Sequence, residues 1–265
     1  MNEYLVSYSF YLLLILGLLV GFGFLFNQLV VSGWNKFGRI FGYRAFYPRF
    51  IGTLVHELGH LLFALITGSR INKVKLFPVI DRKNRSCGGA YVSFAPRYGL
   101  IGSFSLFLSG IGPMLFCPFV IMVLMYFLVP ELYLGILNVI PQVSLIQSDN
   151  LAVVIRQVLY GFFGSFQPEM LTEWKFWLFL VLSVPIANEC VLSGADIKSV
   201  GKGLIVLLIL LAIVGYALSF LPSICLLVVA GLKRTATFLI CIFCLALMFN
   251  LLHWLLGTAL GMIFK

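Results

Sequence analysis

Long apolar runs, separated by short polar segments, constrain this chain more than any other feature of its sequence. They cover approximately residues 4–26, 50–68, 100–128, 132–148, 174–194, 204–230 and 236–262. A helix of about 20 apolar residues crosses the roughly 30 Å hydrocarbon core of a bilayer. Only 10% of the 265 residues are charged, whereas soluble domains have about 25%. The sequence therefore predicts an all-α polytopic membrane protein with six or seven transmembrane helices.

The charges and cysteines fit a protein that lies in lipid. The net charge of +9 comes from 18 basic and 9 acidic residues, and most of the basic ones lie between the apolar runs. That distribution suits lipid head groups and orientation signals, and no nucleic-acid module is recognisable, so we expect a bilayer and no nucleic acid as partner. Five of the six cysteines lie in apolar stretches, where cysteine usually acts as a small hydrophobic residue. No disulfide framework is expected.

The polar segments organise the chain as a single integral membrane domain over residues 1–265. Residues 69–99 alternate polar and apolar side chains around Gly88 and Gly89, which predicts a small membrane-associated β-hairpin. A break near Pro130 divides the long central run into two helices, and residues 150–170 read as an amphipathic connector. The segment 69–99 carries seven basic residues and one acidic residue, which favours the cytoplasmic side. The basic residues of 28–49 argue against that orientation.

The apolar run at 50–68 contains His56, Glu57 and His60, although the whole chain has only three histidines. On an α-helix, two histidines four residues apart project from one face, and their imidazoles can reach a single zinc ion. A glutamate directly after the first histidine falls beside the metal, where it can act as a general base. Ionisable residues within a membrane span are functional by default. The alternative is a chance pattern whose polar groups are hydrogen-bonded inside a helix bundle.

A third metal ligand should reach the same depth as the histidine pair, His56 and His60. His60 lies about eight residues, or roughly 12 Å, before the end of its helix, so the site is nearer the side of residues 69–99. The chain returns to that side near residue 148, which favours Asp149. If 174–194 crosses as one span, Glu189 and Asp196 arrive at the opposite side.

Other assignments stay open at this point. Glu189 and Asp196 are seven residues apart on one helical face and form an alternative ligand pair, for which helix capping by Ser193 or Asp196 is the non-catalytic explanation. His253 lies deep in the last apolar run beside Asn250. We expect it to be a histidine hydrogen-bonded within the bundle.

The motifs resemble those of the site-2 protease family of intramembrane zinc metalloproteases. The resemblance covers roughly residues 50–150 and rests on HELGH at 56–60, Gly88-Gly89, SGIGP at 109–113, GILNVIP at 135–141 and SDN at 148–150. The family has an Asn-x-x-Pro element that leads to an Asp-Gly, which supplies the third ligand. Asn138 and Pro141 match that element, and Asp149 follows His60 by 89 residues (149 − 60). Here Asn150 replaces the glycine, but asparagine also adopts left-handed backbone conformations.

The resemblance implies a catalytic core over 50–150 that ends at Asp149, with 171–265 as additional C-terminal spans. It implies a zinc-dependent metalloendopeptidase in the cell membrane. Because the histidine pair is nearer the side of residues 69–99, which the positive-inside rule places in the cytoplasm, we expect the active site nearer the cytoplasmic face. Zn2+ would be bound by His56, His60 and Asp149, and Glu57 would activate water. The Gly88-Gly89 strand would pair with an unwound transmembrane helix of a membrane-protein substrate, and Asn138 would hydrogen-bond its backbone.

Three alternatives remain compatible with the sequence. A membrane zinc hydrolase for lipid or prenylated peptide would use the same site chemistry. A zinc-stabilised scaffold or a transporter would use the metal without hydrolysis, although a transporter usually shows related halves and an inactive relative would be expected to lose Glu57. The oligomeric state stays open as well.

Overall fold

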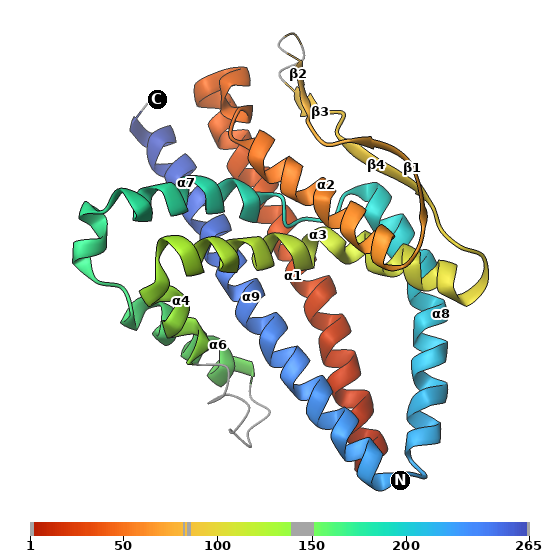
Figure 1. Cartoon of the computed structure of the whole chain (residues 1–265). Helices are drawn as coiled ribbons and strands as arrows, with labels where there is room; N and C mark the ends of the chain where they lie inside the picture. Colours follow the sequence, from red (N-terminus) through yellow and green to blue (C-terminus); the bar gives the residue numbers. More distant parts are fainter. Residues whose placement is uncertain (1–2, 82, 84–85, 139–150, 264–265) are drawn as a thin grey trace.

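The computed structural model describes residues 3–81, 83, 86–138 and 151–263 of the chain. Five of the described helices are long and apolar enough to cross a membrane, which confirms the helical membrane class in its coarse form. These helices, which form most of the body in Figure 1, are α1 (Glu3–Phe41), α2 (Arg49–Ile66), α3 (Gly99–Leu128), α8 (Gly194–Leu218) and α9 (Pro222–Ile263).

Shorter helices connect the long ones. They are η1 (Gly42–Phe46), α4 (Pro130–Leu137), α6 (Leu151–Gly164), η2 (Pro168–Thr172) and α7 (Trp174–Asn188). Pro130 begins α4 directly after Val129, as proline at a first helical position commonly does. The predicted break of the central run near Pro130 is therefore confirmed, and the predicted connector at 150–170 contains α6 and the start of η2.

Three predicted spans differ from the helices that form. The runs 204–230 and 236–262 are divided at 219–221 instead of 231–235, because Pro222 starts α9 and the basic residues at 233 and 234 are compatible with a helix interior. The run 174–194 yields only the 15 residues of α7. That helix is about 22 Å long at 1.5 Å per residue, which is shorter than the hydrocarbon core.

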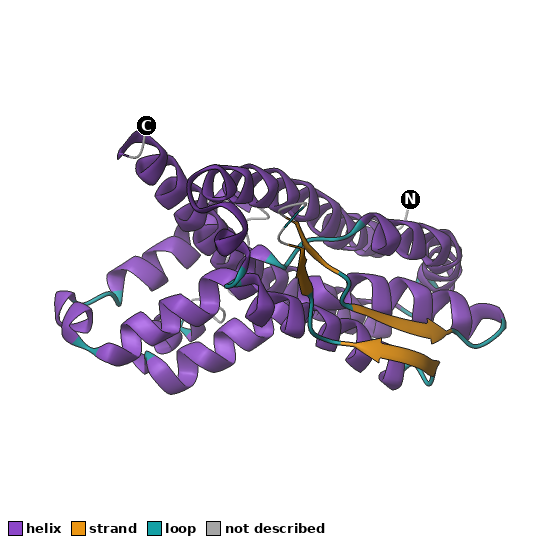
Figure 2. Ribbon diagram, turned by 90° about the horizontal axis from the view of Figure 1, so that it is seen from above, coloured by secondary structure: helices purple, strands orange, loops and turns teal. Residues whose placement is uncertain are grey.

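The predicted hairpin after α2 is confirmed as two antiparallel ladders. Strand β1 (Arg70–Lys75) pairs with β4 (Tyr91–Ala95), and β2 (Val79–Asp81) pairs with β3 (Ser86–Gly88). Gly89 joins β3 to β4 with a φ of +85°, a left-handed conformation that favours glycine. Figure 2 shows the strands lying over the helices in the view from above.

Helix packing brings the backbones of α2 and α3 close together. A Cβ atom on Gly59 of α2 would lie 3.0 Å from the Cα of Pro113, and one on Gly112 of α3 would lie 2.9 Å from the Gly59 carbonyl oxygen. Small residues allow this close approach inside a helical bundle. The glycine of HELGH therefore serves packing, and it sets the distance between the histidine pair and α3.

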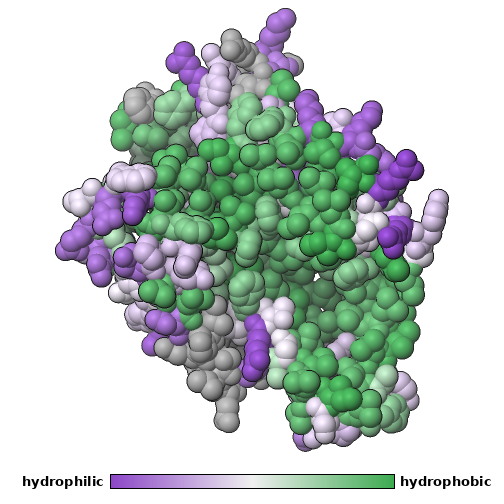
Figure 3. All heavy atoms as spheres, viewed as in Figure 1, coloured by the Kyte–Doolittle hydropathy of each residue, from purple (hydrophilic) through white to green (hydrophobic). Residues whose placement is uncertain are grey.

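A second packing unit joins the two longest helices, α1 and α9, which run side by side in Figure 1. Phe22 and Phe26 of α1 meet Phe243 of α9 with ring centroids 5.2 and 6.0 Å apart. Figure 3 shows a broad apolar surface over the helices, with hydrophilic residues gathered at its periphery. Large side chains of α1 such as Val20 and Phe24 are more than half exposed, as contact with lipid requires.

Candidate metal centre

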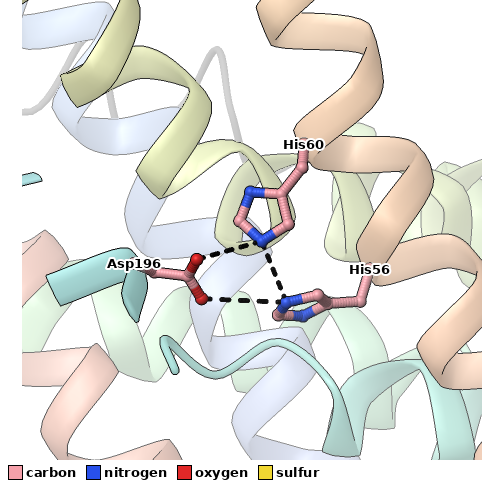
Figure 4. Close-up of side chains that lie close together, drawn as sticks. All are labelled: His56, His60 and Asp196. Carbon is pink, nitrogen blue, oxygen red and sulfur yellow. Dashed lines mark hydrogen bonds and ion pairs between the residues drawn. The ribbon is translucent and has the colours of Figure 1, made fainter. Parts of the chain in front are cut away.

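His56, His60 and Asp196 meet inside the bundle, and all three are buried (Figure 4). The histidines project from one face of α2, and Asp196 lies in the first turn of α8. The two histidine Nε2 atoms are 3.1 Å apart. Asp196 Oδ1 lies 3.2 Å from His60 Nε2, and Asp196 Oδ2 lies 3.8 Å from His56 Nε2. Residues 136 positions apart in the chain (196 − 60) thus share one site.

Backbone carbonyls fix the orientation of both imidazoles. His56 Nδ1 lies 2.7 Å from the Glu189 carbonyl oxygen, and His60 Nδ1 lies 2.7 Å from the Ser109 carbonyl oxygen. A carbonyl oxygen only accepts hydrogen bonds, so each Nδ1 is the donor and the neutral ring keeps a lone pair on Nε2. When both rings are neutral, the two Nε2 lone pairs face one another beside a carboxylate, an arrangement that suits a bound cation.

The donor set fits a divalent metal ion. The three ligand atoms all lie within 4.8 Å of one another. Tetrahedral zinc with Zn–N bonds of 2.0–2.1 Å would hold two imidazole nitrogens about 3.3 Å apart, which is close to the 3.1 Å between the Nε2 atoms. Ligating histidines usually donate their other N–H to a carbonyl or carboxylate, as both do here. His56, His60 and Asp196 could thus hold a metal ion.

Asp196 reaches the histidine pair because α8 begins with a capping box. Ser193 Oγ accepts from the Asp196 amide at 3.2 Å, and Asp196 Oδ2 accepts from the Ser193 amide at 2.7 Å. Such reciprocal bonds satisfy backbone donors that a helix start leaves unpaired. The cap occupies Oδ2 and leaves Oδ1 beside His60 Nε2. The expected capping role of Asp196 is therefore confirmed, and it is compatible with the position of Asp196 beside the histidine pair.

Glu57 is buried between the histidine pair and two cavities. The smaller cavity, about 300 Å³, is also lined by His60, Asp196 and Val92 of β4. The Val92 backbone lies in hydrogen-bonding range of the Glu57 carboxyl group. The larger cavity, about 760 Å³, extends from His56 and Glu57 toward α1 and the strands. A water or substrate group in either cavity can therefore reach Glu57.

The other predicted site residues divide into three groups. Gly88 and Gly89 line the larger cavity together with His56 and Glu57. Asn138 is exposed at the C-terminal cap of α4 and lines neither cavity at the histidine pair. Asp149 lies outside the described residues. The structure thus brings the two glycines to the site and leaves Asn138 apart from it.

His253 lies away from the histidine pair. Its ring packs between Trp34 and Phe37 of α1, with centroid separations of 4.7 and 4.6 Å. Among the described residues its Nδ1 has no hydrogen-bond partner, so this nitrogen lacks the bond expected from the sequence. Aromatic packing, rather than a polar contact at Nδ1, holds the ring between α1 and α9.

The depth argument that set Glu189 and Asp196 apart from the histidines is wrong. It assumed that residues 174–194 cross the membrane as one helix, but α7 ends at Asn188 and a non-helical segment, residues 189–193, leads directly to the site. The local signal was the Ser-x-x-Asp spacing of Ser193 and Asp196, which is typical of a helix start. That spacing, already considered from the sequence as a helix cap, marks the beginning of α8 at Gly194.

Comparisons of the chain with protein-family models, with curated proteins and with solved structures find no match. What this protein does is therefore inferred from the residues and geometry of the site.

Proposed function

We propose that this protein is an intramembrane zinc metalloprotease, similar to the site-2 protease family, that hydrolyses peptide bonds of membrane-embedded proteins. The proposal is supported chiefly by the two facing Nε2 atoms of His56 and His60, 3.1 Å apart beside Asp196, with Glu57 next to His56 in the chain. In the proposal Asp196 is the third zinc ligand in place of Asp149. The catalytic unit then draws on both 50–150 and 171–265.

The chemistry assigned to the chain's own residues is proton transfer and orientation. Bound zinc would supply a Lewis acid and lower the pKa of a coordinated water to about 7. Glu57 takes the proton from the attacking water and passes it to the nitrogen of the scissile bond as the C–N bond breaks. The Glu189 and Ser109 carbonyl oxygens hold the imidazoles in the tautomer that presents Nε2.

Substrate binding is assigned to the edge of β4 and the glycines before it. A substrate helix bonds its own backbone amides, so a segment must unwind before a peptide bond is accessible. Strand β4 pairs with β1 along one edge, and its Val92 lines the smaller cavity together with Glu57. An extended segment can add to a strand edge, and Gly88 and Gly89 offer no side chains to obstruct it. The position of Asn138, away from both cavities, does not support a role in substrate binding.

The proposed setting is the cell membrane, with a transmembrane helix of a membrane protein as substrate. The segment 69–99, which contains the strands, carries seven basic residues and one acidic residue. By the positive-inside rule it lies on the cytoplasmic side, and the active site is nearer that face.

The test compares purified wild-type protein with Glu57→Gln, both reconstituted in bilayers with helical transmembrane substrates. Products are identified by mass spectrometry, and zinc is measured in both proteins. We expect one zinc in each protein and cleavage within a transmembrane segment by the wild type only, with a 10²–10⁴-fold lower rate in the variant, as for loss of a general base. Glu131→Gln, at an exposed glutamate in the first turn of α4, is the matched control.

Full activity of Glu57→Gln with bound zinc would refute the role of Glu57. Hydrolysis of lipid or prenylated peptide, with no cleavage of protein substrates, would move the chain to another class of membrane zinc hydrolase. Zinc binding with no hydrolysis of any of these would favour a scaffold or transporter.

A further inference from the structure

We propose that the ion pair of Arg49 and Glu189 is a positioning device for the metal centre. It holds the connection between α7 and α8, which both orients His56 and brings Asp196 to the histidine pair. The inference rests on the metal site of the proposed function. Measurements of metal affinity test it independently of proteolytic activity.

The ion pair joins the start of α2 to the end of α7. Arg49 Nε donates to Glu189 Oε1 at 2.7 Å, across 140 positions of the chain. The Glu189 side chain is 8% exposed and that of Arg49 is 25% exposed. A charged hydrogen bond with one partner buried is stronger and more directional than an exposed ion pair. It therefore fixes where Glu189 lies relative to α2.

Glu189 acts on the metal centre through its backbone. While its carboxylate accepts from Arg49, its carbonyl oxygen accepts from His56 Nδ1 at 2.7 Å. Arg49 and His56 lie seven residues apart on α2, about two turns and roughly 10 Å along one face. Between them, Gly52 packs against the Pro185 carbonyl oxygen and the Glu189 side chain, with no room for a Cβ atom. One face of α2 thus contacts residues 185–189 at three successive turns.

The same contacts determine where Asp196 lies. Residues 189–193 are not helical and end at Ser193, the N-cap of α8. Cys190 Sγ also donates to the Met114 carbonyl oxygen of α3 at 3.5 Å, so this short connection is anchored on two helices. A displacement of Glu189 would move the hydrogen-bond acceptor of His56 and would shift the start of α8, which carries Asp196.

These contacts assign Glu189 a positioning role rather than that of the alternative ligand considered from the sequence. Its carboxylate is hydrogen-bonded to Arg49, and within the described residues the side chains that could hold a metal ion together are His56, His60 and Asp196. Removing Arg49 alone would leave a buried carboxylate without its cation, which is far more damaging than removing both charges. The proposal therefore predicts that Arg49→Gln weakens metal binding more than the double variant Arg49→Gln/Glu189→Gln does.

The experiment uses the full-length protein in detergent with Co2+ as the probe, titrated against a chelator and followed by its visible absorption. We expect Arg49→Gln to weaken Co2+ binding by roughly tenfold or more, as changes in groups behind metal ligands commonly do, and to alter the spectrum. Adding Glu189→Gln to Arg49→Gln should recover only part of that loss, because the unpaired buried charge is gone but the charged hydrogen bond that holds the connection is still missing. Arg49→Lys should lie between the wild type and Arg49→Gln. Arg44→Gln, an exposed arginine on η1, should bind Co2+ as the wild type does.

Each other outcome is decisive. Wild-type affinity and spectrum in folded Arg49→Gln would overturn this inference alone, even if its unfolding temperature falls, because a merely structural pair would lower stability only. If Arg49→Gln does not fold, the double variant Arg49→Gln/Glu189→Gln tests the proposal, and Co2+ binding as tight as in the wild type would overturn it. Loss of binding in Glu189→Gln with none in Arg49→Gln would make Glu189 a ligand. A wild type that binds no Co2+ would overturn the metal site and this inference together.

Discussion

Replacing Asp196 by asparagine separates its observed role as a helix cap from its proposed role as a metal ligand. Asp196 Oδ2 accepts from the Ser193 amide at 2.7 Å, and Oδ1 lies 3.2 Å from His60 Nε2. Asparagine keeps one oxygen for the cap but loses the negative charge at the metal. Groups that only support a ligand change metal affinity 10–100-fold, so loss of a direct ligand should cost at least 100-fold, or about 2.7 kcal/mol.

Ser193→Ala gives the matched comparison, because it removes the cap and keeps the carboxylate. Loss of an N-cap costs about 1 kcal/mol of stability. Even if all of it reached the metal site, affinity would fall only about fivefold. The two variants should therefore differ by at least about twentyfold in metal affinity, which competition with a chromophoric chelator measures in detergent-purified protein.

Equal effects of Asp196→Asn and Ser193→Ala would refute the reasoning and leave Asp196 as a cap alone. Asp149→Asn completes the comparison, because Asp149 was the ligand favoured from the sequence. We expect it to bind zinc with wild-type affinity. If Asp149→Asn loses zinc and Asp196→Asn does not, Asp149 is the third ligand.

Three further outcomes are expected. Gly59→Ala should lower the unfolding temperature measured in detergent, because its Cβ would press on the Pro113 backbone at 3.0 Å and overpacking costs about 1–3 kcal/mol. The control Gly38→Ala, with open space around it, should be neutral or stabilising, and equal effects of the two variants on the unfolding temperature would contradict the described packing of α2 on α3. Ser109→Ala removes the hydroxyl that donates to the His60 carbonyl oxygen at 3.2 Å but keeps the carbonyl that accepts from His60 Nδ1, so zinc affinity should change less than about twofold and a tenfold loss would count against this orientation of His60. Treatment with 1,10-phenanthroline should abolish substrate cleavage, and Zn2+, but not Mg2+, should restore it because imidazole ligands suit zinc; cleavage that persists after the metal is removed would refute a metal-dependent mechanism.

Hydropathy and helical spacing predicted the parts of the fold that depend on local sequence. Apolar length predicted the membrane-type helices, Pro130 marked the break after α3, and alternation around Gly88 and Gly89 predicted the strands. The four-residue spacing of His56 and His60 placed both on one face of α2, as the structure has them. Each of these features depends on residues within a few turns of one another.

Whether Asp196 reaches the histidine pair depends on where the short helix α7 ends. Cys190, Val191 and Leu192 are apolar, so a hydropathy average extends the preceding run through a segment that is not helical. The cap formed by Ser193 and Asp196 is the local feature that competes with that average. The acceptors of the two histidines, at Ser109 and Glu189, are backbone carbonyls, and a side-chain pattern carries no information about them.

The most direct test of the central claim is anomalous X-ray diffraction at the zinc edge from crystals of the wild-type protein. The account predicts one strong peak between His56, His60 and Asp196, with two nitrogen ligands and one carboxylate oxygen at about 2.0–2.2 Å. A zinc-loaded protein with no peak at this site, or with its only peak on other residues, would contradict it.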